Sequence, residues 1–163
     1  MKNNFLSKIS GFSINKKNHL AINEIDLVEI AKLSERPVYV FNELTIRENI
    51  NSYRDALNLF YPKPSSLFYA SKAFLNLAMG SLLFQEKIGI DVCSEGELYI
   101  ALKAKIPPSH IIMHGNNKSA QELRLAVQSN IHCIIVDNKD ELFLLEKVCS
   151  ELKLQCNVLL RIN

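Results

Sequence analysis

Lys72 is the residue whose type and setting could support covalent chemistry. It lies near the end of Ser66–Phe74, an apolar, aromatic-rich run that is typical of a buried strand. Strand alternation would place Lys72 on one face with Phe68 and Ala70. Burial on that face would lower the pKa of the amine and leave it nucleophilic, able to form a Schiff base with a carbonyl compound. The alternative is an exposed lysine at a strand end, with its ammonium in solvent.

Asp91 is the second candidate, because it interrupts the apolar run Ile88–Cys93. A buried carboxylate needs a partner. Consecutive strands of a strand–helix–strand series are usually neighbours, so Lys72 is the predicted partner. Such a pair could be structural, or it could lie at the carboxyl ends of parallel strands, where folds of this kind place their sites.

Glu97 and Arg161 are weaker candidates. Glu97 follows Ser94 by the spacing of a capping box, and capping alone would explain it. Arg161 is the last charge of the final apolar run. It could bind an anion or a cofactor oxygen, or it could form an ordinary ion pair.

Three polar residues, His114, Asn116 and Asn117, follow another strand-like run and could donate hydrogen bonds to a ligand. Turn formation is the ordinary role of such residues. His110 and His114 have the i, i+4 spacing of a helical metal pair, but Ile111–Met113 between them is typical of a strand. No metal site is therefore predicted.

The elements that must position these side chains form a repeating unit. Strand-like runs begin near Leu67, Gly89, His110, Ile131 and Cys156, and an amphipathic helical stretch separates each run from the next. Three of the helices open with a capping residue and a glutamate three positions later: Ser94 and Glu97, Ser119 and Glu122, Asn138 and Glu141. This pattern predicts α/β architecture with a parallel sheet of about five βα units.

Two arrangements fit five parallel strands. One is an open doubly wound sheet. The other is the N-terminal part of a (β/α)8 TIM-type barrel, truncated after the apolar run that ends in Arg161, Ile162 and Asn163. The absence of a covering helix after that run favours the truncated barrel, and no glycine-rich nucleotide-binding loop follows any of the predicted strands.

The amino-terminal third has a different pattern. Helical spacing from Ile25 to Leu33 is followed by a short predicted strand, Pro37–Phe41. Asn42 can then cap a long helix that ends before Pro62.

The composition is that of a globular protein, with 48% hydrophobic and 22% charged residues among 163. The net charge of +2 and the lack of a basic run predict no binding to nucleic acid. No apolar stretch approaches the length of a membrane span or an export signal. The four cysteines show no closely spaced pairs, so reduced thiols in a cytoplasmic protein are expected.

At the candidate residues the chain resembles the pyridoxal-phosphate decarboxylases of the alanine-racemase-like barrel class. The matching motifs lie between Pro37 and Asn163 and occur in the family's order: Tyr69–Phe74, Asp91–Leu98, His114–Ser119 and Arg161–Asn163. The first motif alone is shared with alanine racemases and ornithine-type decarboxylases. Together with the second and third motifs, it resembles the diaminopimelate decarboxylase branch.

The resemblance implies that Lys72 carries pyridoxal 5'-phosphate as a Schiff base and that Asp91 is its charged neighbour, with Glu97 and Arg161 also near the cofactor. It implies decarboxylation of a small amino acid, meso-2,6-diaminopimelate, to L-lysine and carbon dioxide. An amino-acid racemase or another decarboxylase of the same barrel class, or a non-catalytic cofactor-carrying protein, is the alternative.

The resemblance also implies a division of the chain. Residues 1–36 would be a lead-in segment of the second, β-rich domain, and residues 37–163 a partial cofactor-binding barrel. The family's ring-stacking histidine, phosphate-binding loop and C-terminal β-domain would lie in later segments. Activity would thus belong to the complete enzyme, which is expected to be a homodimer.

Overall fold

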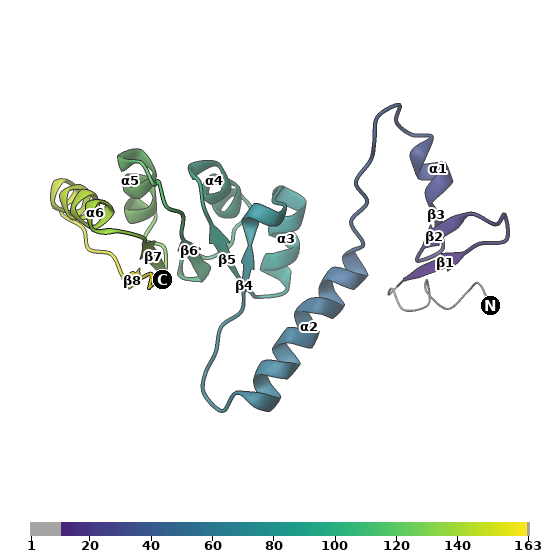
Figure 1. Cartoon of the computed structure of the whole chain (residues 1–163), viewed down its shortest axis with the longest axis horizontal. Coiled ribbons are helices and arrows are strands. Elements are labelled where there is room, and N and C mark those ends of the chain that lie inside the picture. The colour runs from purple at the N-terminus through teal and green to yellow at the C-terminus, as the bar shows by residue number, and fades with distance from the viewer. Residues whose placement is uncertain (1–10, 163) are drawn as a thin grey trace. The chain divides into compact units, whose positions relative to one another are not determined.

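The computed structural model describes residues 11–162. The chain forms two compact units that divide after Pro62, here called the N-terminal unit and the C-terminal unit. All of the candidate residues from Lys72 to Arg161 lie in the C-terminal unit (Figure 1).

The C-terminal unit is a parallel sheet with helices along one side (Figure 1). Its five strands are hydrogen-bonded in sequence order: β4 (Phe68–Ala70), β5 (Gly89–Val92), β6 (Ile111–Met113), β7 (Cys133–Val136) and β8 (Val158–Leu160). The helices that follow the first four strands are α3 (Leu77–Gln85), α4 (Glu95–Lys103), α5 (Ala120–Gln128) and α6 (Lys139–Leu152). Two 3-10 turns, Ser71–Ala73 and Pro108–His110, complete the unit.

The strand order decides between the two predicted arrangements. A doubly wound sheet reverses its strand order at a switch point and places helices on both faces. Here each strand pairs with the next without a reversal, as in a barrel. The prediction of an N-terminal barrel portion is therefore confirmed, and each strand begins within two residues of the expected position.

Strand alternation separates the core from the site. Ile90 and Val92 of β5 are fully buried, as are Ile111 and Met113 of β6. Leucines of the neighbouring helices, such as Leu83, Leu98 and Leu123, are buried as well. Residues between the buried positions point to the opposite face of the sheet. Asp91 is one of these, and it is only partly buried.

All three predicted helix caps form, but only one is a reciprocal capping box. Ser119 accepts from the backbone N–H of Glu122, whose carboxylate accepts from the backbone N–H of Ser119. At α4 and α6, Ser94 and Asn138 each cap the helix. The carboxylate of Glu97 instead accepts from the backbone N–H of Cys93, and that of Glu141 pairs with Lys118.

The N-terminal unit contains an antiparallel sheet and two helices. The strands are β1 (Phe12–Ile14), β2 (Leu20–Ile22) and β3 (Ile25–Asp26), and the helices are α1 (Leu27–Ala31) and α2 (Glu43–Phe60). The helix predicted from Ile25 to Leu33 is thus too long at both ends. Ile25 pairs with β2, and the Asp26 side chain caps a helix that begins only at Leu27.

The strand predicted at Pro37–Phe41 is wrong for the described chain. The described structure has no strand at residues 37–41, and Tyr39 is 90% exposed. Apolar alternation favours an extended backbone, but a strand also requires a hydrogen-bonded neighbour. The helix capped by Asn42 is confirmed as α2. Residues 37–62 belong to the N-terminal unit, while the boundary expected before Pro37 refers to a complete enzyme and stays a prediction.

Candidate active site

Lys72 does not continue the strand. Strand β4 ends at Ala70, and Lys72 is the middle residue of the following 3-10 turn, where it is exposed. The turn is held by Ser71, which is buried and donates its hydroxyl to the backbone carbonyl of Asp91 at 2.8 Å. Of the two alternatives for Lys72, burial on a strand face is not observed, and an exposed amine just after the strand is. Its side chain forms no hydrogen bond or ion pair with any described residue.

Asp91 pairs with His114 and not with Lys72. The Oδ1 atom of Asp91 lies 2.6 Å from Nδ1 of His114, and the two side chains are 21% and 24% exposed. His114 directly follows β6, and its backbone N–H donates to the carbonyl of Val92, so β5 and β6 bring the pair together. An ionised carboxylate only accepts hydrogen bonds, and therefore Nδ1 carries the proton.

Cys93 lies beside this pair, with its Sγ 3.8 Å from the ring nitrogens of His114. Burial raises the pKa of the Cys93 thiol, and the carboxylates of Glu97 and Asp91 raise it further, while Lys72 opposes them. The thiol therefore stays protonated at neutral pH and is a poor nucleophile. Sequence analysis missed this residue because no motif of cysteine chemistry surrounds it.

Glu97 is a capping residue in this structure. Its Oε2 accepts from the backbone N–H of Cys93 at 2.7 Å, and its own N–H donates to Ser94 Oγ at 3.3 Å. These bonds attach the first turn of α4 to the end of β5. The carboxylate is thereby held half-buried at the carboxyl ends of the strands, close to Cys93.

Arg161 follows β8 and forms an ion pair. Its Nη1 donates to Oδ1 of Asp137 at 2.9 Å, and its side chain is 50% exposed. Asp137 follows β7, so the pair joins the ends of two neighbouring strands. The ion-pair alternative for Arg161 is observed, with a partner that sequence analysis did not name.

The structure brings some of the candidates together and separates others. Lys72, Asp91 and Glu97 lie at the carboxyl ends of the neighbouring strands β4 and β5. His114 joins them from β6. Arg161 also lies at the carboxyl end of a strand, but that strand is β8, at the opposite side of the sheet from β4.

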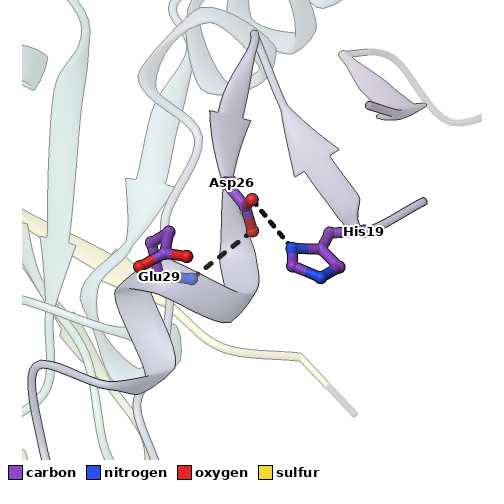
Figure 2. A group of neighbouring side chains, drawn as sticks. All are labelled: His19, Asp26 and Glu29. Atoms are coloured by element: carbon purple, nitrogen blue, oxygen red, sulfur yellow. Dashed lines mark hydrogen bonds and ion pairs between the residues drawn. The ribbon is translucent and has the colours of Figure 1, made fainter. Parts of the chain in front are cut away.

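A second group of titratable side chains lies in the N-terminal unit, where His19, Asp26 and Glu29 approach one another (Figure 2). The Asp26 carboxylate accepts hydrogen bonds from His19, from Asn15 and from two backbone N–H groups of α1. Glu29 forms an ion pair with Lys32 at 3.0 Å. Helix capping and ion pairing explain this cluster without a bound ion.

Comparisons with known proteins identify a family for this chain. Residues 43–163 match the family described as "Pyridoxal-dependent decarboxylase, pyridoxal binding domain". The chain is 42% identical over 150 residues to diaminopimelate decarboxylase of Bacillus methanolicus and 42% identical over 149 residues to that of Bacillus subtilis. It is also similar to the crystal structure of diaminopimelate decarboxylase from M. jannaschii, with a TM-score of 0.86 and 34% identity.

The alignments cover most of this chain but only part of each relative. They include 92% and 91% of the chain, yet 34% of each Bacillus enzyme, and 94% of the chain against 36% of the M. jannaschii structure. Within the described part of the chain, no helix is both long and apolar enough to cross a membrane. The family match spans the whole C-terminal unit, in which Lys72 and the Asp91–His114 pair lie. The chain therefore belongs to the pyridoxal-dependent decarboxylase family and contains residues of its pyridoxal-binding domain.

Proposed function

We propose that this chain supplies the lysine-bearing part of the active site of a diaminopimelate decarboxylase. The reaction would convert meso-2,6-diaminopimelate to L-lysine and carbon dioxide. The observation that carries the proposal is the setting of Lys72, an exposed amine at the carboxyl end of β4, in a chain 42% identical to enzymes of that name. One solved relative, the M. jannaschii enzyme, is in complex with L-lysine, which supports an amino-acid site.

The residues present fit pyridoxal phosphate. An aldehyde cofactor needs an amine that the fold does not already use, and Lys72 has no polar partner among the described residues. The cofactor, when bound, supplies the electron sink that stabilises the carbanion left by loss of carbon dioxide. Lys72 Nζ would be the atom that holds the cofactor.

The other candidates would shape the charge around that amine. His114 holds the Asp91 carboxylate on the strand next to Lys72, where it would favour the protonated form of a nearby nitrogen. Glu97 would add negative charge from the α4 cap. Arg161, oriented by Asp137, would attract an anionic group of the cofactor or substrate.

The wider assignments rest on the family as a whole. We propose a homodimeric, cytoplasmic enzyme in which residues 1–36 belong to the β-rich domain and residues 37–163 to the barrel. The chain spans about a third of the length of its curated relatives, and the remaining barrel strands and the β-domain would complete the site.

A chimera tests the proposed activity. These residues would replace the matching third of the Bacillus subtilis enzyme, and carbon dioxide release from meso-2,6-diaminopimelate would be measured. We expect activity in the chimera, none in its Lys72→Ala form, and retained activity in its Lys103→Ala form, since Lys103 is an exposed lysine of α4 away from the proposed site. Equal activity of the Lys72→Ala and Lys103→Ala chimeras would contradict the proposal.

A further inference from the structure

Lys118 and Glu141 are the two buried charged residues of the described chain. Their side chains are 1% and 4% exposed, and Nζ of Lys118 lies 2.8 Å from Oε1 of Glu141. Neither residue forms a hydrogen bond or ion pair with Asp91, Glu97 or Asp137, whose partners lie elsewhere. A buried ion pair gains little net stability over apolar residues of similar size, so its presence calls for another physical reason.

The contacts of Lys118 indicate that reason. Its ammonium donates hydrogen bonds to the backbone carbonyls of Gly115 at 2.6 Å and Ile135 at 2.9 Å. With the Glu141 carboxylate, which pairs with it by charge, oxygens from three places surround the ammonium: the loop after β6, β7 and α6. Lys118 thus ties the loop that carries His114 to the next strand and the next helix.

Glu141 is itself held in place. Asn138 caps α6 by accepting from the backbone N–H of Glu141 at 2.9 Å, which fixes the first turn of that helix. The carboxylate is therefore presented to Lys118 by a rigid helix terminus. This explains why Glu141 does not complete a reciprocal capping box.

The loop that Lys118 holds has an unusual backbone. Gly115 has φ +119°, a conformation that L-residues with side chains rarely adopt. The backbone of Gly115 is therefore fixed both by this conformation and by the hydrogen bond that its carbonyl accepts from Lys118. His114, whose imidazole holds Asp91, is the residue directly before Gly115.

We propose that Lys118 and Glu141 are positioning residues for the active site. The buried pair fixes the loop at Gly115, the loop fixes His114, and His114 holds the Asp91 carboxylate on the strand next to Lys72. The contacts themselves are independent of the proposed function, and only their catalytic meaning rests on it. Neither residue of the pair is expected to touch the cofactor or the substrate.

The test follows the hydrogen bond from His114 to Asp91 directly. In protein labelled with 15N-histidine, the Nδ1 proton of His114 should give a signal that disappears in His114→Gln. We expect the double variant Lys118→Met/Glu141→Leu to speed the exchange of this proton with water by ~10-fold or more, because local opening of the loop sets that rate.

The matched control is an exposed ion pair of the same unit. Arg124 of α5 and Glu151 of α6 pair on the surface, with side chains 39% and 44% exposed. Arg124→Met/Glu151→Gln should leave the His114 signal unchanged. An unchanged signal in a folded Lys118→Met/Glu141→Leu protein would overturn the proposal.

A second variant covers failure of the first to fold. Glu141→Gln keeps the size of the side chain and removes its charge, so the fold should persist while the proton exchanges faster than in the unchanged protein. Unaltered exchange in folded Glu141→Gln would also overturn the proposal. The measurement uses neither cofactor nor substrate. The positioning role can therefore be contradicted while the proposed activity stands, and the proposed activity can be contradicted while the positioning role stands.

Discussion

Replacing Lys118 by methionine should destabilise the C-terminal unit much more than removing a surface charge. The substitution leaves the Glu141 carboxylate, 4% exposed, without its counter-charge and removes two hydrogen bonds to backbone carbonyls. Breaking one side of a buried pair costs about 3–5 kcal/mol of unfolding free energy. By contrast, Arg124→Met breaks an exposed pair with Glu151 and should cost about 0.2–1 kcal/mol.

The double variant Lys118→Met/Glu141→Leu should recover part of this loss. It removes the uncompensated buried charge, and apolar residues of similar size can replace a buried pair at little net cost. The carbonyls of Gly115 and Ile135 still lose a donor, so a residual loss of about 1–3 kcal/mol is expected.

Urea unfolding of the three variants would test these free energies. Unfolding would be followed through the amide signals of β6 and β7, so that only the C-terminal unit is observed. The expected order of unfolding free energy is Arg124→Met highest, the double variant next, and Lys118→Met lowest. If Lys118→Met lost no more than Arg124→Met, the pair would not be buried as the structure shows, and the positioning role would lose its basis.

Three further predictions concern other parts of the chain. Burial and the neighbouring Cys149 thiol raise the pKa of Cys156 to about 11 from 9.0. Alkylation of Cys156 at pH 8, followed by mass spectrometry, should therefore be about a hundredfold slower than that of an ordinary thiol. Cys149→Ala should restore only part of the rate, because burial remains. Desolvation acts to raise the pKa of Asp26, but hydrogen bonds led by that of His19 outweigh it and lower the pKa from 3.8 to about 2. Because the folded pKa is the lower one, the Asp26 carboxylate stabilises the N-terminal unit above pH 3.8 and loses this effect as the pH falls towards 2. His19→Gln should raise the midpoint of the Asp26 carboxyl titration, followed by 13C NMR. An unmoved midpoint would exclude His19 as a cause of the lowered pKa. Finally, Ser119→Ala removes the reciprocal cap of α5 and should lower the unfolding free energy by about 1 kcal/mol in urea titrations, whereas no loss would show that the cap contributes nothing.

The strand and helix series of the C-terminal unit could be predicted because its signals are local. Short runs of apolar residues mark each strand, and Ser94, Ser119 and Asn138 mark the helix starts. The choice of a barrel over a doubly wound sheet depended on strand order, which no local pattern contains. In the N-terminal unit, Ile25 and the residues after Pro37 show that apolar spacing alone does not identify a partner strand.

The candidate site was predicted in its residues but not in its contacts. Asp91 was expected to face Lys72, because the sequence predicted the two on neighbouring strands. Instead, the hydroxyl of Ser71 bonds the Asp91 carbonyl and turns the chain after Ala70, which moves Lys72 off the strand face. The Asp91 carboxylate is instead hydrogen-bonded to His114, which follows β6, the strand on the other side of β5.

Lys118 was missed because sequence alone indicates exposure for a lysine in a loop. Only the convergence of three oxygens from separate elements makes its burial favourable. Signals of this kind depend on distances between residues far apart in the chain, and therefore the pairing with Glu141 could be found only in the structure.

The central claim is that Lys72 is the amine that holds the cofactor, and reductive labelling tests it most directly. The Bacillus chimera would be incubated with pyridoxal phosphate, reduced with borohydride, digested and mapped by mass spectrometry. We predict a pyridoxyl adduct on the peptide that contains Lys72, little on Lys103, and loss of the main adduct in Lys72→Ala. Equal labelling of Lys72 and Lys103, or undiminished total labelling in Lys72→Ala, would contradict the assignment.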